Sequence, residues 1–467
     1  MLATVAEASV VRSARWGRGS GHGVTYACTV PHEPDTAAVP IPPLPDPHAG
    51  TSWWQDEAPA ARWGAPSSDL RCAVLVVGGG VTGCSAAWHL ARAGVDVVLV
   101  DARAVASGAS GRNGGFLLAG MAHRPVALAE RVGTERALEL HAWSSEGVDR
   151  LLATARAVDA ERYVARTGSL RLAVDAAELE DLEAEAALLE AGGFAVERLG
   201  AGSLPLPHAG GFTGGLRFPR DGRSMPAGWV RALAHAAVAA GARIHDGDAI
   251  TSIDDGASTG VLATTASGRV IRAERVILAT EAWLPRLLPE LRGVVLPYRS
   301  QVLAAAAPRT PDGAVRRVLD HVTWSRRGWD YAQQAADGTL VVGGERDEEV
   351  ERLRHWEEVT VDRDQAWIES WIRRVLEVEP EVVARWAGVL SQTVDGFPFV
   401  GALPGRDARV LCCGGWGGAG NVLGFTCGAL IADLARDLPG AHAAIPREFD
   451  PARLTAEPPV AAGSASC

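Results

Sequence analysis

Three glycines in the spacing G-x-G-x-x-G, Gly78, Gly80 and Gly83, point most directly to chemistry. In such a run the first glycine permits a tight turn, the second lets the backbone approach a pyrophosphate, and the third lets helix and strand pack closely. The helix that follows begins near Val81 and Thr82. Its unpaired N–H groups and the positive end of its dipole face a bound phosphate. A strand-to-helix turn that holds no ligand is the alternative interpretation.

The flanking segments supply the context that this motif requires. Residues 73–77 are wholly apolar, as in a buried parallel strand. A helix is expected over 82–93, ended by Gly94, and a second strand over 95–100. That strand ends at Asp101, followed by Ala102 and Arg103. A carboxylate here accepts ribose hydroxyls and disfavours a 2′-phosphate, so NADP is not expected.

A second glycine-rich loop, 108–115, directly follows the second strand and contains Ser110, Gly111, Arg112 and Asn113 before Gly114 and Gly115. A simple NAD domain has no use for such a loop. A flavin dinucleotide lies extended across its domain, and such a loop can run past its isoalloxazine ring and phosphates. The pattern therefore predicts FAD. Arg112 either neutralises phosphate or forms an ordinary loop ion pair.

Composition narrows the class of protein. A chain of 467 residues, 47% of them hydrophobic, predicts two or three domains, and the net charge of -11 argues against nucleic-acid binding. No apolar run reaches the roughly 18 residues of a membrane span, so we expect a soluble, cytoplasmic protein. All 45 basic residues are arginine, which excludes a Schiff-base lysine.

The seven cysteines show no C-x-x-C spacing, and we expect reduced core thiols and no metal site. A vicinal disulfide at Cys412–Cys413 is the alternative.

The pattern predicts an α/β protein with a discontinuous Rossmann-type domain and a second, mixed-sheet α+β domain. The first is expected over 51–150, 220–290 and 385–440, and the second, which would bind substrate, over 151–219 and 291–384. A disordered arm over 1–50 and a tail over 441–467 complete the chain. Helices are expected over 176–191, 229–240, 348–376 and 421–438, and further strands over 169–174, 275–279, 298–306, 339–342 and 410–413.

With these motifs in place, the chain resembles the D-amino-acid oxidase superfamily of flavoproteins over about residues 52–437. It is most similar to the branch of gamma-glutamylputrescine oxidase, and more remotely to glycine oxidase and sarcosine oxidase. The motifs that carry the resemblance, in the family's order, are Ser52-Trp53-Trp54, the loop 108–115, Ala279-Thr280-Glu281-Ala282-Trp283, Trp386-Ala387-Gly388 with Thr393, Asp395, Pro398 and Gly401, and the loop 415–420.

The resemblance implies bound FAD, covalent or noncovalent, and oxidation of a carbon–nitrogen bond. Gly388 aligns where sarcosine oxidase carries its flavin-linked cysteine, so noncovalent FAD is expected. Leu390 and Gly418 align with the arginines that hold the substrate carboxylate in glycine oxidase. Their loss favours an amine over an α-amino acid, unless Arg299, Arg326 or Arg327 replaces them. Ala419 stands where relatives often carry histidine.

The resemblance and the motifs together give the expected sites. The residues expected to hold FAD are Gly78, Gly80, Val81, Thr82, Gly83, Asp101, Ala102, Arg103, Ser110, Gly111, Arg112, Asn113, Gly114, Gly115, Ile250, Ala279, Thr280, Trp283, Gly388, Gly417, Gly418, Ala419, Gly420 and Asn421. The candidates for catalysis and substrate contact are Trp329, Tyr331 and Trp416, with His321, Glu281 and Glu345 as further polar contacts; each tryptophan could equally be core.

The expected reaction is hydride transfer from an amine to flavin N5, then imine hydrolysis by water. The N–H groups of 417–421 would stabilise charge on the reduced flavin, although plain helix packing also explains that loop. Oxygen is the expected acceptor. An amino-acid or imino-acid oxidase, a dehydrogenase, a flavin subunit of an electron-transfer complex and an NAD-dependent reductase are the alternatives.

Overall fold

The computed structural model describes residues 50–59, 61–257, 260–345 and 350–454. Most of the arm expected over 1–50 and the end of the expected tail lie outside these residues. The described part of the tail packs on the body of the protein, since Phe449 is fully buried and Arg136 pairs with Glu448. Among the described residues, no helix is both long and apolar enough to cross a membrane.

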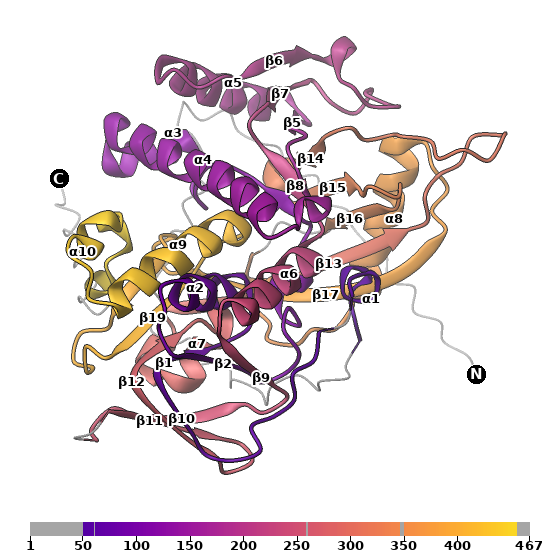
Figure 1. Ribbon diagram of the computed structural model, residues 1–467. Coiled ribbons are helices and arrows are strands. Elements are labelled where there is room, and N and C mark those ends of the chain that lie inside the picture. Colours follow the sequence, from indigo (N-terminus) through magenta and orange to yellow (C-terminus); the bar gives the residue numbers. More distant parts are fainter. Residues whose placement is uncertain (1–49, 60, 258–259, 346–349, 455–467) are drawn as a thin grey trace, which may run out of the picture.

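The first sheet has a parallel centre that confirms the predicted βαβ unit (Figure 1). β1 pairs in parallel with β2 on one side and with β12 on the other, and β12 pairs in parallel with β19. Helices α2, α6 and α9 lie together on one face of this sheet. Its strands are β1 (Leu70–Val77), β2 (Val97–Asp101), β9 (Arg243–Asp246), β10 (Ile250–Asp254), β11 (Val261–Thr265), β12 (Val270–Leu278), β18 (Phe399–Ala402) and β19 (Val410–Gly414).

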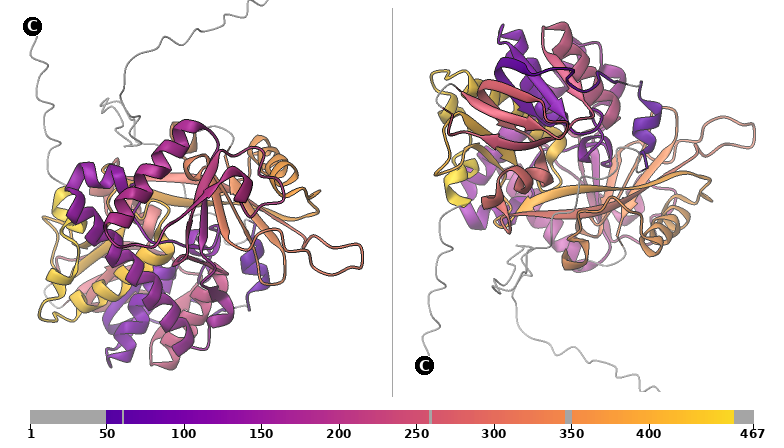
Figure 2. Two further views of the ribbon diagram at one scale, coloured as in Figure 1. Left: turned by 90° about the horizontal axis from the view of Figure 1, so that it is seen from above. Right: turned by 90° about the horizontal axis from the view of Figure 1, so that it is seen from below.

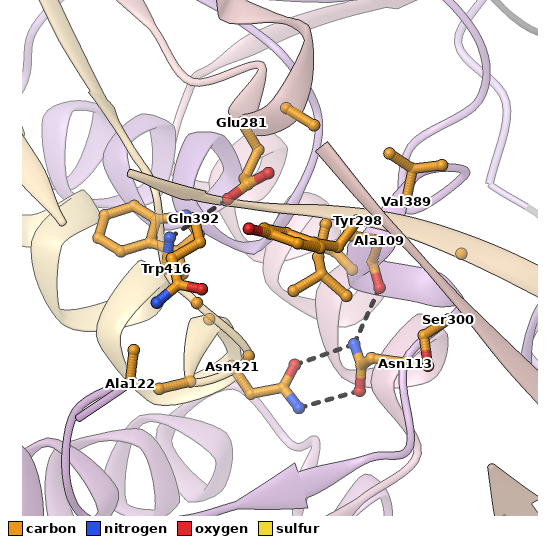
Figure 3. A pocket seen from close by; sticks show the side chains of 18 of the residues that line it. Ala109, Asn113, Ala122, Glu281, Tyr298, Ser300, Val389, Gln392, Trp416 and Asn421 are labelled. Atoms are coloured by element: carbon orange, nitrogen blue, oxygen red, sulfur yellow. Dashed lines mark hydrogen bonds between the residues drawn. The ribbon is translucent and has the colours of Figure 1, made fainter. Parts of the chain in front are cut away.

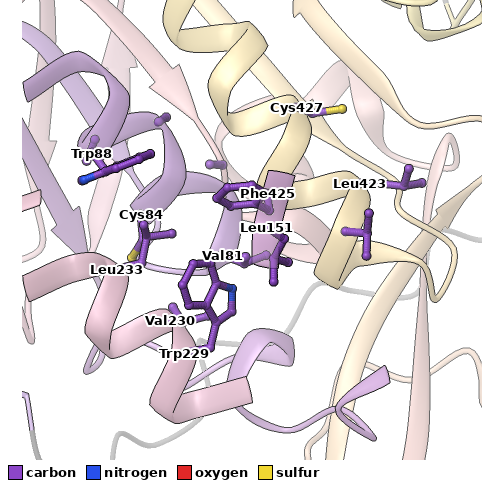
Figure 4. Packing of buried hydrophobic residues seen from close by; sticks show 14 of the residues in the cluster. Val81, Cys84, Trp88, Leu151, Trp229, Val230, Leu233, Leu423, Phe425 and Cys427 are labelled. Carbon is purple, nitrogen blue, oxygen red and sulfur yellow. The ribbon is translucent and has the colours of Figure 1, made fainter. Parts of the chain in front are cut away.

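Small residues let the helices approach one another closely. A Cβ at Gly428 of α9 would lie 2.5 Å from the Thr82 carbonyl oxygen of α2, so a larger residue there would push the two helices apart. Trp229 of α6 and Phe425 of α9 fill the adjoining space (Figure 4). The helices are α1 (Trp53–Glu57), α2 (Val81–Arg92), α3 (Pro125–Val132), α4 (Thr134–Ala157), α5 (Ala176–Ala191), α6 (Pro226–Ala239), α7 (Leu284–Leu287), α8 (Asp362–Leu376), α9 (Gly420–Ala435) and α10 (Ala441–Ala444).

The second sheet is mixed, as predicted, with the order β17-β13-β16-β15-β14-β5-β7-β6 and one parallel pair, β14 with β5. Both views of Figure 2 show its orange strands extending away from the yellow helices of the first domain. Its strands are β5 (Ser169–Ala173), β6 (Glu197–Gly200), β7 (Gly214–Phe218), β13 (Val295–Ala305), β14 (Val322–Ser325), β15 (Asp330–Gln334), β16 (Leu340–Gly344) and β17 (Val382–Thr393), and a small third sheet joins β3 (Phe116–Leu117), β4 (Val164–Ala165) and β8 (Gly222–Ser224).

Two expected boundaries differ from the structure. The charged stretch expected to be helical over 348–376 begins outside the described residues, and within its described part, 350–376, the α-helix covers 362–376, where Ile368, Trp371 and Ile372 pack on the second sheet. The preceding residues 354–361 are irregular and supply Glu358, which pairs with Arg103. Strand β17 pairs along its length with β13, so by strand pairing the second sheet runs to Thr393, past the expected boundary at 385.

The five cysteines of the described chain, Cys72, Cys84, Cys412, Cys413 and Cys427, are buried and unpaired, as expected for core thiols. Cys28 and Cys467 lie outside the described residues.

Candidate active site

The predicted phosphate loop joins β1 to α2 in the expected geometry. Gly78 has a φ of +107°, and a Cβ there would lie 2.6 Å from the Ala279 carbonyl oxygen. A Cβ at Gly83 would lie 1.8 Å from the Gly78 carbonyl oxygen. Gly80 caps α2 without a side-chain hydrogen bond. The Val81 N–H donates to the Ser110 hydroxyl at 2.9 Å, so the N–H groups that follow it in the first turn of α2 are those left for phosphate, while β1, α2 and β12 pack closely.

Asp101 closes the loop from the end of β2. Its carboxylate accepts hydrogen bonds from the backbone N–H groups of Gly79, at 2.5 Å, and of Arg103, at 2.7 Å. Burial raises the pKa of this carboxyl above its ordinary value, and the two N–H groups oppose that change. Each carboxylate oxygen has a second lone pair, so Asp101 keeps the capacity to accept ribose hydroxyls.

Helix α1 holds the second glycine loop. The Ser52 hydroxyl donates to the Gly111 carbonyl at 2.5 Å, and the Trp54 indole donates to the Asn113 carbonyl at 2.8 Å. Gln55 reaches the Ala106 carbonyl at 2.7 Å. The lead-in motif is thus a clasp on the loop 108–115, a role that the sequence analysis did not predict.

Arg103 and Arg112 are held by the protein itself. Arg103 makes a two-pronged pair with Glu358, at 2.7 and 3.2 Å. The Arg112 side chain donates to the carbonyls of Ser107 and Ala387 and lies 3.5 Å from Glu358. The contacts of Arg112 correspond to the loop ion pair, the alternative to phosphate binding that the sequence left open.

One cavity of about 790 Å³ runs past all of these loops, a volume within the range of ligand sites. It reaches from Asp101 and Ile250 to Arg171 and Trp324. Of the residues expected to hold FAD, these line it: Gly78, Gly80, Val81, Thr82, Asp101, Ala102, Arg103, Ser110, Arg112, Asn113, Gly114, Ile250, Ala279, Thr280, Trp283, Gly388, Gly417, Gly418, Ala419, Gly420 and Asn421.

Gly83, Gly111 and Gly115 do not line the cavity. A Cβ at Gly111 would lie 1.9 Å from the Ala106 carbonyl oxygen, and one at Gly115 would lie 2.2 Å from the Gln333 amide nitrogen. These three glycines permit close packing behind the cavity wall and are not placed to contact a cofactor.

The final glycine loop meets the second one through paired amides (Figure 3). Asn113 donates to the Asn421 side chain at 3.1 Å, and Asn421 donates back at 3.0 Å. Gly418 has a φ of +90°, and a Cβ there would meet nothing within 4 Å. An arginine at 418 would therefore require a strained backbone, whereas glycine leaves its N–H uncovered beside the start of α9.

The Tyr331 ring is fixed in a narrow slot on the second-domain side. A Cβ at Gly114 would lie 2.7 Å from this ring, and one at Gly343 would lie 2.0 Å from it. The Tyr331 hydroxyl contacts the Ser300 hydroxyl at 2.8 Å. Burial raises the pKa of Tyr331 above its ordinary value, so the phenol keeps its proton at neutral pH. Trp329 and Trp416 also line the cavity, and Trp416 is at the same time part of the buried hydrophobic core.

Two carboxyl groups face the same cavity. Glu345 is almost fully buried and accepts a hydrogen bond from the Gln301 N–H at 3.1 Å. Glu281 accepts from the Ser391 hydroxyl at 2.9 Å. Burial raises the pKa of each group to about 7. His321, the third polar candidate, contacts the Thr167 carbonyl and does not line the cavity.

The three arginines considered as replacements for a carboxylate-binding arginine differ in whether they line the cavity. Arg299 and Arg327 line the cavity, together with Leu390. Arg326 does not, because it pairs with Asp330 at 2.7 Å and stacks on Trp367. Arg327 lies 3.1 Å from Asp181 at the far end.

Sequence reasoning missed the far wall of the cavity. Arg171 is enclosed between the rings of Phe218 and Trp324, with ring centroids 4.2 and 4.5 Å from its guanidinium carbon. Burial lowers its pKa to about 10, and it pairs with the buried carboxylate of Glu185. No local motif signals this group, because strands β5, β7 and β14 and helix α5 assemble it.

The residues present fit FAD. The cavity is long, and it passes the start of α2, the carboxylate of Asp101 and the backbone of Gly418. The Thr280 hydroxyl oxygen is buried at its wall without a hydrogen-bond partner among the described residues, as expected where a ligand completes the contacts. No group of three or more metal-ligating side chains occurs within the described chain.

Residues 73–434 match the family model for FAD dependent oxidoreductases (DAO), so the chain belongs to the DAO family. Gamma-glutamylputrescine oxidoreductase of Escherichia coli strain K12 is 29% identical over 387 residues, which cover 79% of this chain and 85% of the relative. Glycine oxidase of Geobacillus kaustophilus strain HTA426 is 27% identical over 380 residues, covering 77% and 92%.

Solved structures agree on the fold. The crystal structure of glycine oxidase from Geobacillus kaustophilus matches with a TM-score of 0.66 at 24% identity, covering 79% of this chain and 96% of that one. L-proline dehydrogenase from P. horikoshii matches with a TM-score of 0.66 at 18% identity, covering 82% and 98%. The protein is therefore an FAD-dependent oxidoreductase of the fold predicted from its sequence.

Proposed function

We propose that this protein oxidises a carbon–nitrogen bond of an amine that lacks an α-carboxylate, with noncovalent FAD as cofactor and oxygen as electron acceptor. One observation carries the choice of an amine: the apolar residue Leu390 lines the cavity. Leu390 is the residue that aligns with a carboxylate-binding arginine of glycine oxidase. The similarity to gamma-glutamylputrescine oxidoreductase points the same way.

The residues available to hold FAD follow from the cavity lining. The N–H groups at the start of α2 would bind its pyrophosphate, Asp101 its ribose, and the loop 417–421 its ring system. Bound FAD would supply the two-electron acceptor. Noncovalent attachment is supported by Gly388, which offers no side chain for a covalent link. Acid precipitation should therefore release free FAD and leave colourless protein.

The chain's own residues would bind and orient the amine. Trp329, Tyr331 and Trp416 offer aromatic surface for a cation and exclude water. The Tyr331 hydroxyl oxygen, held by Ser300, can accept a hydrogen bond from an N–H of the neutral amine, which leaves the lone pair of the nitrogen free. Only the neutral amine has a lone pair that assists loss of hydride from the neighbouring carbon. Water suffices to hydrolyse the resulting imine.

Anaerobic titration of the holoprotein tests the proposal. Amines without a carboxylate next to the reacting carbon, including putrescine and gamma-glutamylputrescine, should bleach the flavin absorbance. Glycine, sarcosine and other α-amino acids should not. Bleaching by α-amino acids alone would contradict the choice of an amine. Admitting air should then restore the colour and form hydrogen peroxide. If no hydrogen peroxide forms, the isolated chain would be a dehydrogenase or an electron-transfer subunit.

An amino-acid oxidase is the second candidate, and Arg299 is the observation that favours it. Its half-buried guanidinium lines the cavity on β13, and burial lowers its pKa below the ordinary value. If this arginine holds a carboxylate, Arg299→Gln should raise KM for an α-amino acid at least tenfold and leave KM for a simple amine unchanged. The matched control is Arg269→Gln, which removes an exposed arginine that does not line the cavity.

A further inference from the structure

Glu281 stands where the cofactor crevice is formed. Strands β1, β12 and β19 run in parallel, and ligands of such sheets bind beyond the carboxyl ends of the strands. Glu281 follows β12, whose end abuts the phosphate loop through Ala279. The Trp416 N–H of the final glycine loop donates to its carboxylate at 3.3 Å (Figure 3). The residue thus lies between two loops that line the cofactor cavity.

The backbone of Glu281 is strained. Its φ is +51°, a left-handed conformation that costs a side-chain-bearing residue free energy and that surrounding structure must enforce. Such strain is typical of functional positions, which directs attention to what the side chain does.

Two neighbouring polar atoms in this turn have no hydrogen-bond partner among the described residues. Glu281 Oε1 accepts hydrogen bonds from Ser391 and Trp416, whereas Oε2 is buried and has no partner among the described residues. The adjacent Thr280 Oγ1 is likewise buried without one. Both residues line the cavity. Unpaired buried polar atoms are costly, so the pair indicates a polar ligand at this point.

Few charged side chains influence the Glu281 carboxyl. Strand β17 contributes Ser391 and β19 contributes Cys413, while Tyr298 and Arg299 of β13 and Arg286 of α7 line the same cavity. Burial keeps the Cys413 thiol protonated by raising its pKa. Burial is also the main influence on the Glu281 pKa, and hydrogen bonds, rather than an arginine, oppose it. A pyrophosphate placed in the same crevice would add negative charge and favour the neutral carboxyl further.

We propose that Glu281 and Thr280 form a polar contact site for FAD in which the Glu281 carboxyl is protonated in the holoprotein and donates a hydrogen bond to the cofactor. Above neutral pH, FAD binding then takes up one proton from solvent onto the carboxylate, which becomes the neutral acid. The site needs no substrate, so it stands or fails independently of the reaction proposed above.

The dissociation constant of FAD for the apoprotein, measured between pH 6 and 9, tests this inference. In the parent protein the constant should rise above pH 7 by up to about tenfold per pH unit, the slope of one linked proton. Calorimetry at pH 8 in buffers of different ionisation enthalpy should show proton uptake approaching one per FAD. Glu281→Gln, a neutral isostere, should bind FAD tightly with little pH dependence and take up no proton.

The matched control is Glu345→Gln, which removes the other buried carboxyl of the same cavity and should retain the parent slope and uptake. Glu281→Gly, which removes the carboxyl and relieves the positive φ, guards against misfolding of the glutamine variant and should also abolish the uptake. A parent affinity that is flat from pH 6 to 9, or a slope that persists in both Glu281 variants, would overturn the inference.

Discussion

Glycines around the cavity serve two physical purposes. Gly83 and Gly111 face backbone carbonyls closer than any Cβ could lie, so their lack of a side chain permits packing. Gly418 faces open space, so its lack of a side chain exposes the backbone to a ligand. The motif already assigns close packing to Gly83, whereas the roles of Gly111 and Gly418 are distinguished only by the structure.

Gly83→Ala should disrupt the packing of α2 on β1. Its Cβ would lie 1.8 Å from the Gly78 carbonyl oxygen, and relief requires the helix to shift. We expect a loss of about 3 kcal/mol in the free energy of unfolding, at the upper end for overpacking, and a loss of bound FAD. Urea unfolding and flavin absorbance measure the two effects. Gly202→Ala, where nothing lies within 4 Å, should change neither.

Glu345 should make stability depend on pH. Its pKa rises on folding from 4.5 to about 7, so the folded state holds the proton more tightly than the unfolded state. Stability from this group is therefore complete below pH 4.5 and is lost as pH rises to 7. At about 1.4 kcal/mol per pKa unit, the loss is on the order of 3 kcal/mol.

Glu345→Gln should flatten that dependence. Urea unfolding of the apoprotein at pH 5 and pH 8 makes the comparison, and the difference between the two pH values should shrink in the variant. A variant whose stability falls as steeply as the parent's would show that Glu345 is not the group responsible.

Among the elements, those with strong local patterns were predicted and those assembled by distant segments were not. The apolar run of β1, the glycine loop and helix α5 carry their own signals, and α5 occupies the predicted 176–191. The helix predicted over 348–376 was too long because acidic and basic residues are typical of a solvated helix. Within the described part of this stretch, the segment 362–376 is the one that also offers an apolar face to the second sheet.

The site divides in the same way. The cofactor side lies on loops that directly follow strands, so spacing reveals Gly78, Asp101 and Asn113. The far wall around Arg171 joins segments distant in the sequence, and its contacts with Phe218 and Trp324 leave no periodic trace. Orphan atoms such as Glu281 Oε2 become visible only when all neighbours are placed.

Helix α1 is short, yet it fixes the loop 108–115 from outside. Ser52 caps the helix and also binds the Gly111 carbonyl, so Ser52→Ala removes both contacts. We expect a loss of about 1 kcal/mol in stability and an FAD dissociation constant raised about five- to tenfold. Fluorescence titration of the apoprotein measures the binding. Ser203→Ala, on an exposed turn, is the control, and equal effects of the two variants would refute the role of the clasp.

At the scale of the whole molecule, both sheets contribute to one cavity. The first supplies the loops after β1, β2, β12 and β19, and the second supplies Ser300 and Leu390 from its paired strands β13 and β17. A ligand that fills the cavity contacts both sheets, so it should stabilise the molecule as one unit.

Removal of FAD should therefore loosen the two sheets together. Saturation at 100 times the dissociation constant adds about 2.7 kcal/mol, and the apoprotein should lose that increment. Hydrogen exchange followed by mass spectrometry should show faster exchange in peptides covering 78–83, 108–115, 298–303 and 386–392. ADP, which matches only one end of FAD, should restore protection at 78–83 while 386–392 remains exposed. If FAD protected only the phosphate loop, the second sheet would be independent of the cofactor, and the cavity would not couple the two.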